Sequence, residues 1–332
     1  MTGPIISVDR SETTSVARLP LVTVITPAYN RAAYLDETIQ SVLQQDYPRI
    51  EYIVLDDGSR DNTVEVLKKY DGQIAWESHP NMGETRTVNK GFAMSRGGII
   101  GVVNSDDPLA SNTAISTMVQ AMIARPEVVV VYPDWDMIDS EGRAFRHETT
   151  FEYDYIDMVR WHHCVPGPGA FFCRKVVEQL GGRDPQFRYV GDFDFWLRAG
   201  LLGPFARIPQ TLATFRVHEG SASVSQTGSL MAEEHIRLVN KYYGLPGLPE
   251  EFRRVKREAY SSAYYIAGCV CGQGASIEKT RYYLRALWYC PGKYLREYRD
   301  RRGTIRHEIQ DLLGQGIVRR RAVGAGASGQ RV

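Results

Sequence analysis

Apolar and polar positions alternate in short blocks through the first 135 residues of the chain. Five short apolar runs have the length of buried strands, and they lie at residues 21–26, 51–55, 73–77, 99–103 and 128–132. Between them, apolar positions three and four residues apart predict amphipathic helices at residues 34–45, 61–70, 84–95 and 114–124. Strands that alternate with short helices predict an α/β fold with a mainly parallel, doubly wound, Rossmann-like sheet.

Beyond the fifth strand the pattern is mixed. Apolar runs at residues 169–173 and 211–217 predict two further strands, and residues 192–199 predict a short helix. Farther along the chain, the spacing of apolar residues predicts helices in two Tyr-rich segments, at residues 260–271 and 279–288. We therefore expect a C-terminal helical extension behind the α/β domain.

These changes in pattern predict four parts of the chain. They are a disordered lead-in at residues 1–19, an α/β domain at 20–225, a helical C-terminal region at 226–321 and a disordered tail at 322–332. Small and polar residues dominate the tail, which is typical of disordered termini.

Composition and charge narrow the class of protein. The 332 residues are 43% hydrophobic and 24% charged, as in ordinary globular proteins, and the net charge of +1 favours no nucleic-acid partner. No apolar segment is long enough to span a bilayer, and the N-terminus lacks a signal-peptide core. The chain has five cysteines, an odd number, and no two of them have CxxC spacing. The sequence therefore indicates neither a disulfide framework nor a zinc site. We expect a cytoplasmic protein.

Two adjacent carboxylates follow the strand predicted at residues 99–103, in the motif Asn104-Ser105-Asp106-Asp107. At the end of a buried strand each charge loses hydration, which is costly. A divalent cation such as Mg²⁺ or Mn²⁺ would remove that cost and could hold a diphosphate as well. Alternatively, Asp106 or Asp107 caps a helix that starts near Pro108. The motif alone leaves both interpretations open.

Two more motifs follow predicted strands. In Thr26-Pro27-Ala28-Tyr29-Asn30-Arg31 an exposed Tyr29 could stack on a base, or it could pack on the next helix. In Asp56-Asp57-Gly58-Ser59 the carboxylate of Asp57 could accept a hydrogen bond from a pyrimidine or ribose, or it could belong to an ordinary turn. Because ligands bind beyond the carboxyl ends of strands in such sheets, these motifs and Asp106 are expected on one rim.

Two later motifs carry titratable side chains. Asp192 and Asp194 open the short helix predicted at residues 192–199. They could serve as helix caps, or their aromatic neighbours could desolvate a carboxylate so that it acts as a general base. His218 lies in a Gly/Ser-rich loop, where it could bind a metal or phosphate, or be an ordinary packed or surface histidine.

Taken together, these segments resemble the family 2 glycosyltransferases. The resemblance covers about residues 20–225 and rests on six motifs in family order, among them Gly…Asn89-Lys90-Gly91-Phe92 and a DXD-type metal motif at Asn104–Asp107. The other four are the segments at residues 22–31, 53–63, 169–174 and 191–198. Each motif is degenerate, but six in the correct order and spacing are specific.

The resemblance implies a GT-A fold, with a nucleotide-binding half at residues 20–107 and an acceptor half at residues 108–225. It also implies an inverting, metal-dependent transfer of a sugar from a nucleotide-diphosphate donor to an acceptor hydroxyl, in cell-surface polysaccharide or glycoconjugate assembly. A UDP or dTDP donor is favoured, because the family's counterpart of Asp57 binds the base. The acceptor would be a glycan, a lipid-linked molecule or a small molecule.

The family's site residues are carried over by motif. Asp192 matches the general base, with Asp194 as second choice, and Asp107 and His218 match metal-binding positions with Mg²⁺ or Mn²⁺. The nucleotide-binding positions are Pro27, Tyr29, Asn30, Arg31, Asp57, Arg86, Asn89 and Asp106, and the acceptor-side positions are Phe171, Asp194 and Trp196. Inversion needs one in-line displacement, so one carboxylate takes the acceptor proton and no protein nucleophile is required.

The chain departs from the family pattern at two points. Gly191 precedes Asp192, where relatives often have Glu or Met, and the segment before Asn89 is Glu84-Thr85-Arg86, where relatives often have Gln-Ser-Asp. Arg86 could contact phosphate or be a surface residue. The Gln-x-x-Arg-Trp signature of processive synthases is absent, which predicts one sugar added per binding event.

Two other functions remain open from the sequence. One is a non-catalytic nucleotide-sugar-binding or scaffold protein on the same fold. The other is a nucleotidyltransferase, which would normally carry a Gly/Arg/Lys-rich phosphate loop near the first strand; residues 27–31 do not form one.

The C-terminal region also leaves alternatives. The arginines at residues 293–321, with Trp288, Tyr289 and Tyr294, would suit peripheral contact with the inner face of a membrane, or they could lie on a solvated helical face. The C-terminal helices could instead close over the acceptor or form a homodimer.

Overall fold

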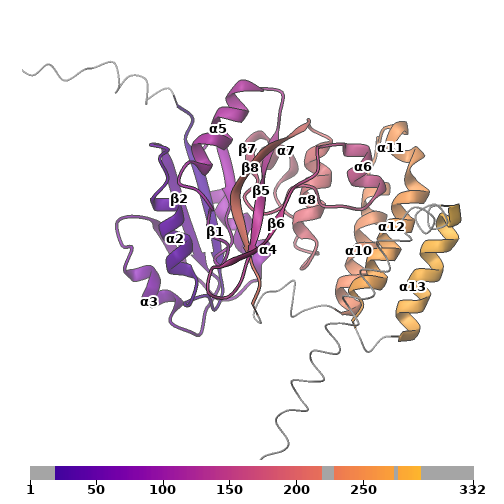
Figure 1. Cartoon of the computed structure of the whole chain (residues 1–332), viewed down its shortest axis with the longest axis horizontal. Helices are drawn as coiled ribbons and strands as arrows, with labels where there is room; N and C mark the ends of the chain where they lie inside the picture. Colours follow the sequence, from indigo (N-terminus) through magenta and orange to yellow (C-terminus); the bar gives the residue numbers. More distant parts are fainter. Residues whose placement is uncertain (1–18, 219–227, 273–275, 293–332) are drawn as a thin grey trace, which may run out of the picture.

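The structure is a computed structural model, and it describes residues 19–218, 228–272 and 276–292. Within these residues, eight strands form one sheet with the order β3-β2-β1-β4-β7-β5-β6, and β8 pairs with β5. Figure 1 shows the sheet between layers of helices, with the C-terminal helices on one side. The predicted lead-in and tail and the arginine-rich stretch lie outside the described residues, as does the predicted boundary at residue 225.

The parallel part of the sheet comes from the first third of the chain. It consists of β1 (Val22–Ala28), β2 (Ile50–Asp56), β3 (Ala75–Ser78) and β4 (Ile99–Val102). The first strand is central, and Val22 pairs with Ile50 on one side and Ile99 on the other. All seven residues of β1 are buried, because helices cover both faces of the sheet.

Four helices connect and cover these strands: α2 (Leu35–Leu43), α3 (Thr63–Lys68), α4 (Glu84–Met94) and α5 (Ala114–Ala124). Successive side chains of β1 point to opposite faces. Val24 packs in the cluster that contains α2, α3 and α5, whereas Ile25 packs in the cluster that contains α4. The doubly wound arrangement predicted from the sequence is therefore confirmed for this part of the chain.

The second part of the sheet is mixed. It contains β5 (Val130–Ile138), β6 (Ala144–Glu148), β7 (Phe171–Cys173) and β8 (Phe205–Arg216). Strand β7 is antiparallel to both β4 and β5, whereas β8 runs parallel to β5. The sheet is therefore parallel only in its core. Strand β6 and two short helices, α6 (Tyr155–Arg160) and α7 (Lys175–Leu180), were not predicted.

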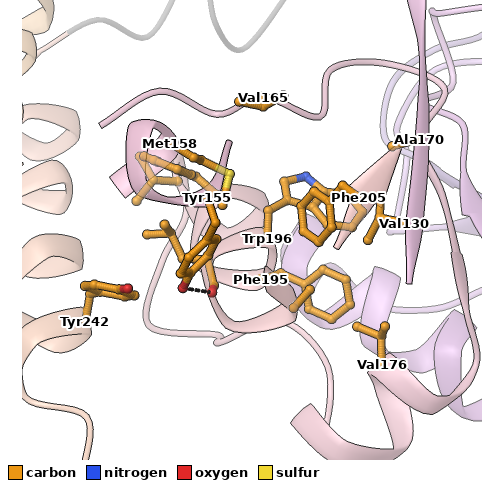
Figure 2. Close-up of a cluster of buried hydrophobic side chains, with 14 of the residues drawn as sticks. Val130, Tyr155, Met158, Val165, Ala170, Val176, Phe195, Trp196, Phe205 and Tyr242 are labelled. Carbon is orange, nitrogen blue, oxygen red and sulfur yellow. Dashed lines mark hydrogen bonds between the residues drawn. The ribbon is translucent and has the colours of Figure 1, made fainter. Parts of the chain in front are cut away.

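Helix α8 (Gly191–Gly200) packs on the same face of the sheet as α4. Figure 2 shows its Phe195 and Trp196 among buried side chains from the sheet and from α6. The Tyr155 hydroxyl lies in this apolar cluster and donates a hydrogen bond of 2.7 Å to the carbonyl oxygen of Leu197. The bond satisfies a polar group that would otherwise be costly to bury.

The C-terminal helices are α10 (Ser229–Tyr243), α11 (Glu250–Arg254), α12 (Lys256–Val270) and α13 (Ser276–Tyr289). Helix α12 lies between α10 and α13 (Figure 1). Leu238, Val239 and Tyr242 of α10 join the buried cluster around α8. The predicted helical extension is therefore present, and its first helix shares the core of the α/β domain. No helix of the described ranges is long and apolar enough to cross a membrane.

The close approach of β4 and β7 gives a test of this packing. A Cβ atom at Gly101 of β4 would lie 2.4 Å from ring atom Cε1 of Phe171, which is fully buried. Gly101→Ala should therefore lower the free energy of unfolding by about 1–3 kcal/mol, measured by urea denaturation. Gly98→Ala is the matched control, because a Cβ there meets nothing within 4 Å. Equal stability of the two variants would contradict this packing.

Candidate functional site

A cleft of about 1160 Å³ opens at the carboxyl ends of β1, β2 and β4. Its position follows from the topology, because parallel strands that meet in one sheet end on the same rim. Eight of the residues predicted from the sequence line this cleft: Pro27, Tyr29, Asn30, Arg31, Asp57, Arg86, Asp106 and Asp107. The expected convergence of three strand-end motifs on one rim is thus what the structure shows.

Asp107 is a buried carboxylate that lines the cleft. Its Oδ1 atom accepts a hydrogen bond of 2.7 Å from the backbone N–H of Arg216, and its Oδ2 atom accepts one of 3.0 Å from Asn104 Nδ2. Burial raises the pKa of Asp107 to about 7, and repulsion by Asp106 adds to the increase, against the lowering effect of Arg216 and Asn104. The helix cap considered as an alternative is not formed, because the next helix begins only at Ala114.

Asp106 lies beside two cationic or potentially cationic side chains. Arg31 Nε donates a hydrogen bond of 3.0 Å to Asp106 Oδ2, and His218 Nε2 lies 2.9 Å from the same oxygen. The imidazole of His218 also packs against Tyr34, with ring centroids 4.6 Å apart. The structure therefore brings His218 to the carboxylate pair, although 112 residues separate it from Asp106.

Arg216 is a central residue that the sequence interpretation missed. Its side chain is fully buried, and its guanidinium donates to the backbone oxygens of Asp106 and Asp139, at 2.9 and 3.1 Å, and to Glu37. The ring of Tyr34 lies under the guanidinium, 4.9 Å away. Arg216 thus fixes the end of β8 to the carboxylate loop. The only sequence signal was its position at a strand end, two residues before His218.

The chemistry of the carboxylate pair fits a divalent cation held jointly with a substrate. Carboxylate oxygens are the ligands that Mg²⁺ and Mn²⁺ prefer. Among the residues that the structure describes, no three His, Cys, Asp or Glu side chains converge on one metal position. Mg²⁺ commonly uses one or two carboxylates and completes its shell with water and substrate phosphates. The donor set of Asp106 and Asp107 matches that type of site rather than a preformed protein cage.

Asp57 organises the opposite end of the cleft. Its buried carboxylate accepts hydrogen bonds from the backbone N–H groups of Met82 and Gly83, at 2.7 and 3.0 Å. These bonds fix the loop that leads into α4, and Met82 and Gly83 line the cleft. The ring of Tyr29 is exposed in the cleft, as stacking on a base would require.

Asn30 holds two strand-end loops together. Its backbone N–H donates to Ser59 Oγ and its side-chain oxygen accepts from the backbone N–H of Arg60, both at 2.8 Å. Its φ of 53° lies in the left-handed region, which Asn tolerates better than most residues. The nucleotide-side motifs after β1 and β2 therefore form one bonded unit.

The two predicted residues of α4 have different surroundings. Arg86 is exposed and lines the cleft. Asn89 does not line it; the amide of Asn89 donates to the carbonyl oxygen of Arg183 at 2.7 Å and accepts from the N–H of Arg183 at 2.8 Å. Asn89 therefore holds the loop after α7 in place and has no contact with the cleft itself.

Asp192, the predicted base, is exposed on the first turn of α8; it is not among the residues that line the cleft, but its charge acts on Glu84, which lines it. Gly191 approaches Thr85, which lines the cleft; a Cβ at Gly191 would lie 3.3 Å from Thr85 Oγ1. Glu84, the residue before Thr85, also lines the cleft, and its side chain is half exposed. Desolvation by the surrounding protein raises the pKa of Glu84, and the negative charges of Asp192 and Asp106 raise it as well. The positive charge of Arg183 lowers this pKa. The expected desolvation of Asp192 by its aromatic neighbours is absent, because those rings point into the core.

The three predicted acceptor-side residues are buried in the core and do not line the cleft. Phe171 packs on Gly101 inside the sheet, and Trp196 lies in the cluster of Figure 2. Asp194 is buried and pairs with Arg198 Nη2 at 2.7 Å and Lys241 Nζ at 2.6 Å. Their motifs matched because core packing also uses aromatic and paired charged residues. Another part of the cleft wall, which the sequence did not predict, is formed by Phe187, Arg188, Tyr189 and Phe215.

A second missed residue, Glu234 of α10, positions the part of this wall at residues 188–190. Its buried carboxylate accepts hydrogen bonds from three successive backbone N–H groups, those of Arg188 at 2.9 Å, Tyr189 at 2.7 Å and Val190 at 3.3 Å. The next residues begin helix α8, which carries Asp192. Glu234 had no signal in the sequence, because a Glu in an amphipathic helix usually faces solvent.

Comparisons with known proteins agree with this site. Residues 23–181 match the model of the family described as glycosyl transferase family 2. The chain is similar to an uncharacterized glycosyltransferase of Mycobacterium tuberculosis, with 30% identity over 186 residues that cover 55% of this chain and 70% of that protein.

Two solved structures share the fold. S. aureus TarS 1-349, in complex with UDP-GlcNAc, has a TM-score of 0.63 and 17% identity, and the match covers 80% of this chain and 79% of that one. The mannosyltransferase PcManGT from Pyrobaculum calidifontis, in complex with GDP-Man and Mn²⁺, has a TM-score of 0.57 and 18% identity, covering 83% and 77%. The GT-A-type fold expected from the motifs is therefore confirmed.

The raised pKa of Asp107 predicts an unusual pH dependence of stability. Between pH 4 and 7 the folded, metal-free protein holds a proton on Asp107 that the unfolded chain has lost, so this residue lowers stability as the pH rises. Asp107→Asn should therefore raise the free energy of unfolding by about 1–3 kcal/mol at pH 7.5 and by little at pH 4. The measurement is urea denaturation in the presence of EDTA. The exposed Asp46 gives the control variant, Asp46→Asn, and equal behaviour of the two would refute the prediction.

The hydrogen bonds of Glu234 predict a local as well as a global effect. Glu234→Ala leaves three backbone N–H groups without their acceptor and should cost about 2–4 kcal/mol of stability. Hydrogen exchange of the amides of residues 188–190 should accelerate more than that of the sheet. The neighbouring Glu233 is exposed, and Glu233→Ala should change neither quantity. Unchanged exchange at residues 188–190 would show that Glu234 does not position this loop.

Proposed function

The chain belongs to glycosyl transferase family 2 and is a glycosyltransferase that uses a nucleotide-sugar; from this we propose that it transfers one sugar, with inversion, to an acceptor hydroxyl. The observation that carries the proposal is one cleft lined by Tyr29, Asp57, Asp106 and Asp107, with the exposed Asp192 close enough for its charge to act on Glu84, another lining residue. A nucleoside, a diphosphate and an acceptor could thus be placed in line.

The donor is proposed to lie along this cleft. Tyr29 would stack on the base, Asp57 with its loop would contact the base edge, and Arg31 and Arg86 would face the diphosphate. We favour a UDP or dTDP sugar; the complex of TarS with UDP-GlcNAc supports a uridine donor. The complex of PcManGT with GDP-Man shows that the same fold also accepts a guanosine donor, so the base must be measured.

The residues proposed to hold the metal are Asp106 and Asp107, with His218 beside them. Bound Mg²⁺ or Mn²⁺ would supply Lewis-acid stabilisation of the negative charge on the departing diphosphate. The presence of Mn²⁺ in the PcManGT complex supports the choice of metal. Arg31 adds a fixed positive charge next to the same position.

Asp192 is proposed as the general base. Its carboxylate would take the proton of the acceptor hydroxyl as that oxygen attacks the anomeric carbon of the donor. The bond from this carbon to the diphosphate oxygen breaks in the same displacement, so the configuration inverts. The acceptor would enter along the wall formed by Phe187, Tyr189 and Phe215. With one sugar added per binding event, the proposed role is a single step in cell-surface polysaccharide or glycoconjugate assembly.

Replacing the proposed base separates catalysis from donor binding. Asp192→Asn should lower the rate of donor turnover about 10²–10⁴-fold, because removal of a general base has effects of this size. Donor binding should remain, since Asp192 is not among the residues that line the cleft. The assay is Mn²⁺-dependent sugar release from UDP-, dTDP- and GDP-sugars, with binding followed by thermal shift.

The control is Glu178→Gln, an exposed carboxylate on α7. Full activity of Asp192→Asn would show that Asp192 is not the general base. Donor binding without turnover by the unchanged protein, with or without acceptor pools, would favour the non-catalytic scaffold alternative.

A further inference from the structure

Helix α13 presents an exposed apolar stripe. Ile277, Leu284 and Trp288 are 72%, 61% and 74% exposed, and Leu287 beside them is 45% exposed. With 3.6 residues per turn, positions 277, 281, 284 and 288 fall on one face of the helix. Figure 1 shows α13 at the edge of the molecule farthest from the sheet. An isolated exposed apolar side chain is ordinary, but four on one helix form a contiguous surface of the kind used for binding.

The stripe is not the packing face of α13. The opposite side of the helix buries Tyr282 and Ala286 against α12, and Ser261 of α12 donates a hydrogen bond of 2.7 Å to the carbonyl oxygen of Ala286. Gly268 of α12 allows the ring of Tyr283 to approach closely. The helix therefore already has its intramolecular partner, and the exposed stripe needs another explanation.

Basic side chains accompany the stripe. Arg281 lies within it and Arg285 at its border, by the same helical spacing. From Ser276, where α13 begins, to Arg321 the sequence has twelve Lys and Arg but only five Asp and Glu, although the whole chain has a net charge of only +1. The positive charge of the protein is thus concentrated in and directly after α13.

We propose that α13 docks the protein on an anionic lipid surface. The exposed Trp288 and leucines would enter the interface between headgroups and acyl chains, where Trp is favoured, and Arg281 would face the lipid phosphates. A second copy of the chain fits less well, because a two-fold pairing of this stripe would place the arginines of one copy near those of the other. The proposal rests on α13 alone and is independent of the enzyme's donor and acceptor.

The test uses the full-length protein and sedimentation with vesicles. Binding is compared between vesicles of phosphatidylcholine and vesicles of equal parts phosphatidylcholine and phosphatidylglycerol. We expect association with the anionic vesicles at about 0.1 M salt and loss of most of it at about 1 M, where the screening length falls from about 10 Å to about 3 Å.

Variants separate the apolar and the charged contributions. Leu284→Ser should weaken binding at least about tenfold, because one buried leucine is lost. Arg281→Gln should weaken binding about fivefold. The control is Ile123→Ser on α5, since Ile123 is also exposed (54%) but lies on a different helix. It should leave binding unchanged, and donor turnover should be unchanged in all three variants.

Three outcomes would overturn the proposal. They are no association with anionic vesicles, association that is equal with neutral vesicles and insensitive to salt, and a dimer in light scattering that Leu284→Ser converts to monomer. The last result would identify the stripe as an interface between two copies of the chain.

Discussion

The site depends on the contact between the carboxylate of Asp107 and the backbone N–H of Arg216. Strands β4 and β8, whose ends carry these residues, are not neighbours in the sheet; β7 and β5 lie between them. The chain after β4 crosses this gap, and Thr214 Oγ1 donates a hydrogen bond of 2.6 Å to the carbonyl oxygen of Pro108. The crossing brings the parallel core and the mixed part of the sheet to one cleft. Without it, His218 would not reach Asp106.

The sequence predicted the parallel core well because each element there carries its own periodicity. Strands β1, β2 and β4 are mainly apolar and are followed by polar or turn residues, so their ends, and hence the rim, could be located; β3 is short and mostly exposed. Strand β6 carries no such pattern, because most of its residues are exposed. The cleft wall at residues 187–189 was missed for another reason. It is held by the buried Glu234, which accepts hydrogen bonds from backbone groups some 45 residues away and leaves no local pattern in the sequence. Phe171 and Trp196 show the opposite case. Their motifs predicted a role in the site, but both side chains are buried in the core and pack there.

Helix α10 is part of the structure that positions the cleft wall and the start of α8. Glu234 and Lys241 are seven residues apart and therefore lie on one face, two turns from each other. Glu234 holds the loop before α8, and Lys241 bridges Asp184 and Asp194 at 2.7 and 2.6 Å. These two charged side chains of α10 thus hold the segments on either side of Asp192. A chain without α10 would bury the carboxylate of Asp194 with one partner fewer, and unpaired buried charges are strongly destabilising.

The charges around Asp106 and Asp107 bear on whether this site binds a metal ion. Two carboxylates at the end of a buried strand need compensation, but that need does not specify a metal ion. Here Asp106 is compensated by Arg31 and contacts His218, while Asp107 receives backbone and amide hydrogen bonds and has a pKa raised to about 7. Side-chain cations, hydrogen bonds and a retained proton can each offset part of the burial cost. The carboxylate pair therefore establishes a demand for positive charge. The case for Mg²⁺ or Mn²⁺ rests on the proposed diphosphate, whose negative charge would add to that demand beside Arg31 and Arg86.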